Sequence, residues 1–272
     1  MLYKYLPAKR LDVLKSLKIR FTQLRALNDP FEALPLINTN SETEAFIEQM
    51  ELDAQDLWKN QFPEEQSPEN YETLQNTIGN LKIDILERMS PSSIGVKVVD
   101  MINPKILILS LSKTFSNLLM WSHYADNHKG FVIGFDESHE FFYRKDHRGA
   151  NTSPNKVSYT TQRSVTHQSD YDSYEKILCE KSINWAYEEE VRIFRSFKKD
   201  TRICSGNDEA GYPIYLFELP KECIKSVYIG ANAQPDLKNE ILSSIKYHDL
   251  CADIYEIVMS KTCYEIEYQK VE

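Results

Sequence analysis

The chain has 272 residues, 42% hydrophobic and 27% charged, which is typical of a globular protein with one large core or two small ones. Its net charge of −9 disfavours non-specific binding to DNA, RNA or anionic membranes, because the long-range field repels polyanions. Only 8 glycines are present and neither GxGxxG nor GxxxxGK[ST] occurs, which argues against a glycine-rich phosphate loop.

The cysteines and the first residues bear on the location of the protein. Five cysteines are present, an odd number with no CxxC pair, so neither a disulfide framework nor a zinc ribbon is expected. The opening string MLYKYLPAKRLDVL lacks the apolar core of a secretory signal, and no apolar run is long enough to span a bilayer. We therefore expect a cytoplasmic protein with free thiols and no membrane partner.

Short elements open the chain. The pattern predicts a strand over 2–6, a helix over 11–17 with leucines three residues apart, and an alternating strand over 19–24. These elements place the first strand of the core at the very start of the sequence.

Segment 28–32, with the sequence NDPFE, has the chemistry of a helix N-terminus. Asp29 is a good N-cap, Pro30 suits the first helical position, and Glu32 follows the cap by three residues, as in a capping box. We expect this segment to begin a helix and to be mainly architectural.

An acidic helical region follows. Runs over 42–57 and 74–89 predict two helices, and the charged, proline-containing stretch 62–71 predicts the loop between them. We expect a helical insertion at about 40–100 that covers the sheet and has no catalytic role.

The remainder predicts more strands than helices, with a mainly irregular polar stretch over 137–173. Strands are expected over 106–111, 131–135, 190–197, 214–219, 226–229, 252–259 and 263–268, and helices over 117–125, 174–183 and 235–247. Because strands and helices do not alternate regularly, we predict an α+β protein with a mixed or mostly antiparallel sheet. We expect a single domain over 1–272 that includes the insertion.

Two hydroxyls share one face of the strand predicted over 106–111 and its continuation. In the string LSLS, Ser110 and Ser112 point one way and the leucines the other, because side chains alternate along a strand. The pair suits the orientation of a ligand or a carboxylate, although a strand that emerges into solvent gives the same pattern.

Segment 120–130, MWSHYADNHKG, packs aromatic and ionisable side chains between two apolar strands. Trp121 and Tyr124 suit either anchoring of a helix or stacking against a nucleotide base. Three residues in it have donor atoms that zinc accepts, but their spacing matches no familiar helical metal motif: His123, Asp126 and His128. We therefore expect no metal site.

The string WAYEEEVRI at 185–193 clusters carboxylates near a cation. If the chain is extended, Glu188, Glu190 and Arg192 share a face, and Val191 on the other face seeks the core. Adjacent carboxylates repel each other, so a compensating charge is needed, from Arg192 or from Lys181. A solvated strand edge with an ion pair is the alternative interpretation.

The strings NDPFE, MWSHYADNHKG and WAYEEEVRI together resemble an uncharacterised bacterial family that is catalogued as a domain of unknown function. Some members of that family accompany mobile elements or defence against phage. The resemblance extends from the LYKY start to the VYIG strand near 227–230 and implies no chemistry by itself.

A second resemblance, to ADP-ribosyltransferases of the arginine-modifying type, implies an activity. Those enzymes carry in order a basic residue on the first strand, a Ser-Thr-Ser strand and a Glu-x-Glu-Val strand. This chain has Lys4, then LSLSK at 109–113, then Glu188-Glu189-Glu190-Val191. It departs from the pattern in having Lys4 where Arg or His is usual, and Leu111 in place of Thr.

The resemblance implies that Glu190 binds a ribose hydroxyl of NAD and stabilises an oxocarbenium-like transition state, while Glu188 steers the acceptor. Ser110 would position the carboxylate or the ribose, and Lys4 would bind phosphate or ribose. The remaining cofactor-binding residues that we expect are Ser112, His123, Tyr124 and Arg192.

We therefore expect an NAD-using enzyme similar to ADP-ribosyltransferases, of the kind found among bacterial toxins and phage-defence effectors. NAD is the expected co-substrate, and the sequence does not specify the acceptor. Two other classes stay open. One is a non-enzymatic module that senses a nucleotide or a protein, and the other is a metal-dependent nuclease or phosphoesterase, which the acidic net charge disfavours.

Overall fold

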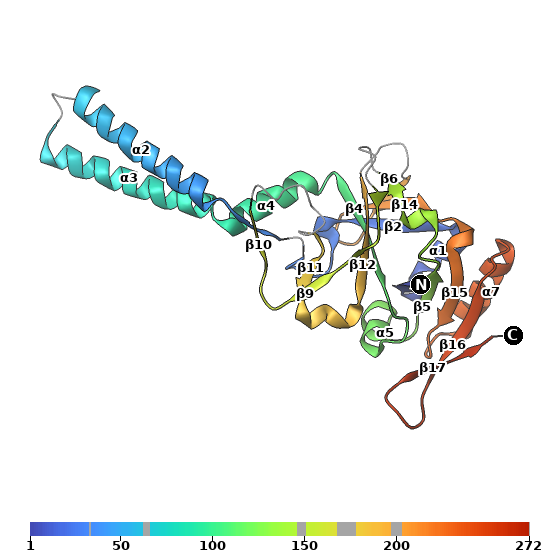
Figure 1. The fold of residues 1–272 in the computed structure, drawn as a ribbon. Helices are drawn as coiled ribbons and strands as arrows, with labels where there is room; N and C mark the ends of the chain where they lie inside the picture. The colour runs from blue at the N-terminus through green and yellow to red at the C-terminus, as the bar shows by residue number, and fades with distance from the viewer. Residues whose placement is uncertain (33, 62–65, 146–150, 168–177, 197–202, 272) are drawn as a thin grey trace. The chain divides into compact units, whose positions relative to one another are not determined.

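The computed structural model describes the chain except residues 33, 62–65, 146–150, 168–177, 197–202 and 272 (Figure 1). It divides into two compact units, each considered by itself. Unit 1 comprises Met1–Glu32, Asn103–Thr161 and Cys179–Glu272, and unit 2 comprises Ala33–Ile102 and Gln162–Leu178.

Unit 1 is built on a sheet of 11 strands, with the order β13-β14-β2-β4-β1-β5-β15-β16-β17 and with β12 joining β4 to β8. All pairs in it are antiparallel except β15 with β16, so the predicted α+β class with a mixed sheet is confirmed. The strands are β1 (Leu2–Leu6), β2 (Lys18–Gln23), β4 (Ile106–Ser112), β5 (Phe131–Phe135), β8 (Asn155–Lys156), β12 (Glu190–Ser196), β13 (Ile203–Asn207), β14 (Pro213–Glu218), β15 (Ile224–Ile229), β16 (Asp253–Met259) and β17 (Ile266–Lys270).

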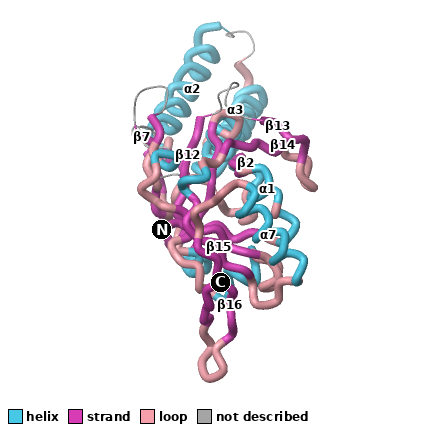
Figure 2. The backbone as a smooth tube through the Cα atoms, turned by 90° about the vertical axis from the view of Figure 1, so that its right-hand side faces the viewer, coloured by secondary structure: helices cyan, strands magenta, loops and turns pink. Residues whose placement is uncertain are grey.

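The main core lies between this sheet and two helices, α1 (Asp12–Ser16) and α7 (Pro235–Tyr247), which lie next to each other (Figure 2). Phe131 and Leu2 from the sheet pack with Leu14 and Ile241 from the helices. Helix α7 begins with Pro235, whose fixed φ suits the first helical turn, and its predicted bounds are confirmed.

A smaller core on helix α5 (Leu118–Tyr124) holds the aromatic residues of segment 120–130. Asn117 caps this helix by accepting hydrogen bonds from two backbone N–H groups. Trp121 is fully buried and its indole N–H donates to the Phe115 carbonyl at 2.7 Å, so its predicted anchoring role is confirmed. Trp185, on a 3₁₀ helix over Ile183–Glu188, is half-buried.

Strands β1 and β4 are paired over a much shorter length than their neighbours, which leaves an opening between them. Among the described residues these strands pair only at Tyr3 with Ser112, whereas β1 pairs with β5 over all five of its residues. Lys4 occupies the opening, and its ammonium donates to the Ser110 carbonyl at 2.8 Å, in place of a backbone donor from β1.

Unit 2 contains the helices predicted for the insertion and a small parallel sheet. Ser67 caps α3 by accepting from the Asn70 amide, and an ion pair of 2.9 Å joins Lys82 to Glu51 between α2 and α3. Figure 1 shows these two helices side by side. The elements are β3 (Leu36–Asn38), α2 (Asn40–Gln61), α3 (Pro68–Arg88), α4 (Pro91–Ile102) and β10 (Val165–His167).

Three expectations need correction. Segment 28–32 forms a turn, not a helix start, since the Glu32 amide donates to the Asp29 carbonyl and no helix follows before Asn40. The predicted helix over 174–183 lies partly outside the described residues, and its end is instead strand β11 (Glu180–Ser182). The stretch 137–173, expected to be mainly irregular, contributes short strands such as β9 (Ser158–Thr160), which pairs with β11.

No helix in the described part of the chain combines the length and the apolar character that a bilayer crossing requires.

Candidate functional site

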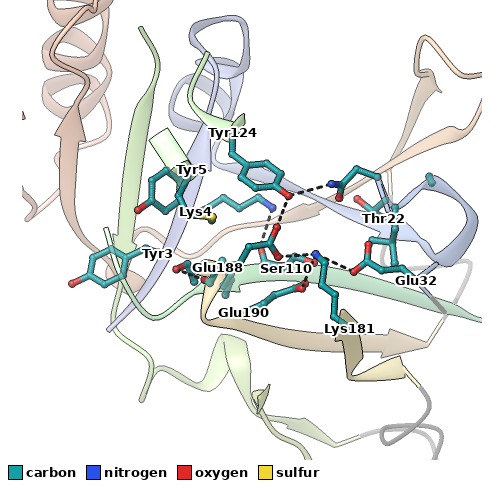
Figure 3. A pocket seen from close by; sticks show the side chains of 16 residues that line it. Tyr3, Lys4, Tyr5, Thr22, Glu32, Ser110, Tyr124, Lys181, Glu188 and Glu190 are labelled. Carbon is teal, nitrogen blue, oxygen red and sulfur yellow. Dashed lines mark hydrogen bonds and ion pairs between the residues drawn. The ribbon is translucent and has the colours of Figure 1, made fainter. Parts of the chain in front are cut away.

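A cavity of about 210 Å³ lies in unit 1 at the opening between β1 and β4 (Figure 3). Both strands, helix α5, the 3₁₀ helix over Ile183–Glu188 and the turn that ends at Glu32 contribute to its wall. Its polar lining comprises Tyr3, Lys4, Tyr5, Thr22, Asn28, Glu32, Ser110, Ser112, Tyr124, Lys181, Glu188 and Glu190.

The antiparallel register of β12 on β4 aligns the two strands that carry the polar motifs. Glu190 lies opposite Ser112 and Arg192 lies opposite Ser110, so the serines and the charged residues share a face. The Ser110 hydroxyl donates a hydrogen bond to the Glu190 carboxylate. Val191 lies on the opposite face of β12 and is buried in the core, as predicted.

Five charged side chains form one buried network, here called the charge cluster: Glu32, Lys181, Glu188, Glu190 and Arg192. The Lys181 ammonium contacts all three carboxylates, at 2.6 Å to Glu188, 3.2 Å to Glu32 and 3.4 Å to Glu190. Arg192 binds both oxygens of Glu190, at 2.8 Å through Nε and 2.9 Å through Nη2, and also contacts Glu32. Each carboxylate thus has a cationic partner, as buried charges require.

The left-handed backbone of Glu189 explains how Glu188 and Glu190 reach the same cation. Glu188 ends the 3₁₀ helix and Glu190 begins β12, so the extended arrangement considered for 188–193 holds only from Glu190 onwards. Glu189, with φ of 45°, reverses the chain between them and leaves its own side chain exposed. The Ser112 hydroxyl donates to the Glu188 carbonyl at 2.7 Å and holds this reversal against β4.

Tyr124 and Asn28 continue the network towards the cavity. The Tyr124 hydroxyl donates to Glu188 Oε1 at 2.5 Å, and the Asn28 amide donates to the same hydroxyl at 3.1 Å. Burial raises the pKa of Tyr124, so its hydroxyl stays protonated and serves Glu188 as a fixed donor.

The surroundings shift the pKa values of Glu190 and Glu188 in opposite directions. Burial alone raises the pKa of Glu190, but the charge and hydrogen bonds of Arg192, followed by Lys181, outweigh it and lower the value to about 2. Burial is also the largest influence on Glu188, and there it prevails, so the pKa is raised. Glu190 is therefore a permanent anion, whereas Glu188 is the more basic carboxylate, the division typical of paired acid–base sites.

Lys4 is a further group in the cavity whose pKa is shifted. Its burial lowers the pKa of the ammonium to about 8, against which nearby Glu190 acts in the opposite direction. A lysine in this state binds an anion such as a phosphate while it is protonated.

The structure brings together six of the residues selected from the sequence: Lys4, Ser110, Ser112, Tyr124, Glu188 and Glu190 all line the cavity. Two others do not line it. Arg192 is fully buried and supports Glu190, and exposed His123 pairs with the Tyr187 hydroxyl at 2.9 Å.

Glu32 and Asn28 were not selected as site residues, yet both line the cavity. The string NDPFE that contains them was noticed, but its local chemistry favoured a helix cap. Its link to the site runs to Arg192, 160 residues away, which spacing within the motif does not reveal.

In the described part of the chain, no group of three His, Cys, Asp or Glu side chains is arranged to hold a metal ion. The carboxylates of the charge cluster are bound by Lys181 and Arg192.

Comparison with known families supports the recognition of an uncharacterised domain. Residues 120–193, which include two of the three strings noted in the sequence, match the model of a family described as protein of unknown function (DUF2971). Comparisons with curated proteins and with solved structures gave no match.

Proposed function

We propose that the protein is an enzyme that transfers a glycosyl group from NAD, in the manner of the ADP-ribosyltransferases that the sequence resembles. The observation that supports this proposal is the convergence of Lys4, Ser110 and Glu190 on one cavity from three neighbouring strands, β1, β4 and β12. The three motifs that carry the resemblance lie far apart in the sequence, so they can act together only where the fold brings them to one cavity.

The reaction breaks the bond between the ribose C1′ and the nicotinamide nitrogen, and the bonding electron pair leaves with that nitrogen. Positive charge develops on the ribose, and a fixed anion stabilises it more in the transition state than in the ground state. Glu190 suits this role because its low pKa keeps it ionised and Arg192 holds both of its oxygens in place.

Glu188 has the chemistry to assist the acceptor. As the acceptor forms its bond to C1′, it loses a proton, and a carboxylate with a raised pKa is the better base to receive that proton. Tyr124 and Lys181 each donate to one oxygen of Glu188, which orients the carboxylate. Lys4 supplies the positive charge for the pyrophosphate of NAD while its ammonium is protonated.

The net charge of the cluster fits a cationic transition state. Three carboxylates and two cations leave one negative charge in excess, before Lys4 is counted. In a buried site such a field is screened less than in water and acts strongly on a developing charge.

NAD consumption measured by chromatography tests the proposal. Glu190→Gln keeps the shape of the side chain and removes its charge, so turnover should fall by about two orders of magnitude or more. Glu189→Gln is the matched control, because that neighbouring side chain is exposed. Unchanged turnover in Glu190→Gln, or an equal loss in both variants, contradicts the proposal.

A nucleotide-binding module without turnover is the second candidate. It is favoured by the pairing of Glu190 with Arg192, which satisfies both carboxylate oxygens inside the protein itself. Calorimetric titration of NAD with no consumption after prolonged incubation would support this candidate over the enzyme. For either one we propose a cytoplasmic role in bacterial defence, which rests on the family resemblance alone.

A further inference from the structure

One oxygen of the charge cluster lacks a partner. Glu32 Oε1 contacts the Lys181 ammonium at 3.2 Å and accepts from Arg192, whereas Glu32 Oε2 is buried and meets no hydrogen-bond donor among the described residues. Glu188 and Glu190 differ in this respect, because each of their four oxygens accepts at least one hydrogen bond.

This oxygen requires an explanation because Glu32 is so deeply placed. Its side chain is only 2% exposed. A buried charged group with an unmet acceptor is destabilising, and native proteins rarely retain one without a functional reason. Glu32 lines the cavity (Figure 3), so a ligand bound there can supply the donor once Oε2, which is covered in this structure, turns to face it.

The rest of the turn holds Glu32 in place. The Glu32 amide donates to the Asp29 carbonyl at 3.0 Å, and the Asp29 carboxylate accepts from the Phe31 amide at 2.9 Å. Lys181 and Arg192 both contact Oε1, so Oε2 is the oxygen left for a ligand. The turn thus fixes the backbone from which the acceptor is presented.

We propose that Glu32 determines ligand specificity by accepting a hydrogen bond from the carboxamide N–H of nicotinamide. This inference rests on the proposed function and adds the residue that distinguishes the amide from the acid form of the co-substrate. A carboxylate accepts from an amide N–H, whereas it repels the carboxylate of nicotinate.

The spacing within the cluster agrees with this assignment. Glu32 and Glu190 both bind Nη2 of Arg192, so their carboxylates lie within roughly 6 Å of each other, two hydrogen-bond lengths. The carboxamide and the scissile bond of nicotinamide riboside are substituents on one six-membered ring. A nicotinamide ring whose bond from N1 to the ribose C1′ lies beside Glu190 therefore places its carboxamide beside a neighbouring group.

The substitution Glu32→Gln tests the inference by exchanging an acceptor for a donor. The glutamine oxygen replaces Oε1 and still accepts from Lys181 and Arg192, so the amide nitrogen takes the place of Oε2. Binding of nicotinamide and of nicotinate is measured by ligand-observed NMR or calorimetry on the full chain. The same pair of measurements on NAD and its nicotinic acid analogue serves as a check.

In the wild type we expect nicotinamide to bind at least about tenfold more tightly than nicotinate. In Glu32→Gln the preference should vanish or reverse, whereas Glu189→Gln should keep the wild-type ratio. A ratio unchanged by Glu32→Gln overturns the inference, as does a wild type that binds neither compound.

Failure of this inference and failure of the proposed function are distinguishable. If NAD is consumed but Glu32→Gln leaves the ratio unchanged, the enzyme stands and the role of Glu32 is wrong. If Glu32-dependent discrimination is observed without NAD turnover, the role of Glu32 stands and the protein is a binding module.

Discussion

The strongest physical consequence of the charge cluster is acid sensitivity that originates at Glu190. Glu190→Gln removes the anion that Arg192 binds through two nitrogens and that Lys181 also contacts. The guanidinium stays buried with only part of its compensating charge, and an unbalanced buried ion destabilises the folded state. We expect Glu190→Gln to fold but to be less stable than the wild type near neutral pH.

The lowered pKa of Glu190 sets the size and the pH window of this effect. A fall from 4.5 to about 2 corresponds to about 3 kcal/mol of stabilisation near pH 7, at about 1.36 kcal/mol for each pKa unit. Because the folded pKa is the lower one, the contribution is present above the unfolded value of 4.5 and is lost as the pH falls towards 2. At about pH 3.5 roughly 1 kcal/mol of it should already be gone.

Urea unfolding of both proteins at a series of pH values measures the effect. The difference in the free energy of unfolding should be about 3 kcal/mol near neutrality and should narrow by roughly 1 kcal/mol on going to about pH 3.5. Glu189→Gln, whose side chain is exposed, should follow the wild type throughout. A difference that does not depend on pH, or that widens in acid, would refute the electrostatic role of Glu190. The same curves identify a temperature at which Glu190→Gln is fully folded, so that a loss of turnover is not confused with unfolding.

Two further predictions concern other parts of the wall. Lys4→Met should abolish a rise in stability with pH, because burial lowers the folded pKa of Lys4 to about 8 and the unfolded state therefore binds more protons between that value and 10.5. In urea unfolding the wild type should gain up to about 2 kcal/mol relative to the variant between about pH 7 and 9.5. A difference that stays constant with pH would contradict this prediction. Asp29→Ala should lower the free energy of unfolding by about 1 kcal/mol, since it removes the acceptor of the Phe31 amide. It should also weaken nicotinamide binding, because it loosens the turn that holds Glu32. Unchanged binding in a stable variant would show that the turn does not position Glu32.

The strands of unit 1 were predictable where burial leaves a strong pattern. Phe131–Phe135 is apolar throughout because both of its faces are covered, and its bounds are confirmed. Strand β13, with the sequence ICSGN, was not predicted, since its side chains are short and mostly polar and it pairs only at the edge of the sheet. The burial of Val191 followed from alternation within β12.

Several residues of the site could be predicted from the sequence, but the way in which the backbone brings them together could not. Ser110, Ser112 and Glu190 follow from strand periodicity, because antiparallel pairing preserves the face on which a side chain lies. Glu188 was selected on the assumption of an extended backbone, and it reaches the cluster through the left-handed turn at Glu189 instead. Such a conformation is disfavoured for a glutamate, so no local propensity predicts it.

Glu32 is the site residue that local sequence patterns could least have predicted. Within NDPFE it has the spacing of a capping residue, and local hydrogen-bond chemistry gives no reason to expect anything else. Its contacts to Lys181 and Arg192 depend on chain segments about 150 residues further along, which only the folded sheet brings into place.

The composition of the charge cluster is itself an argument for function. A buried ion-pair network is a weak source of stability, because the loss of hydration offsets most of the attraction between the charges, and apolar side chains of similar size often serve the fold as well or better. Here five charged side chains form one buried network and four of them line one cavity, with an excess of one negative charge before Lys4 is counted and with one carboxylate oxygen of Glu32 without a donor. A network that served stability alone would be expected to balance its charges and to satisfy every oxygen. A cationic transition state would balance the excess charge, and a ligand with an N–H donor would satisfy the free oxygen of Glu32.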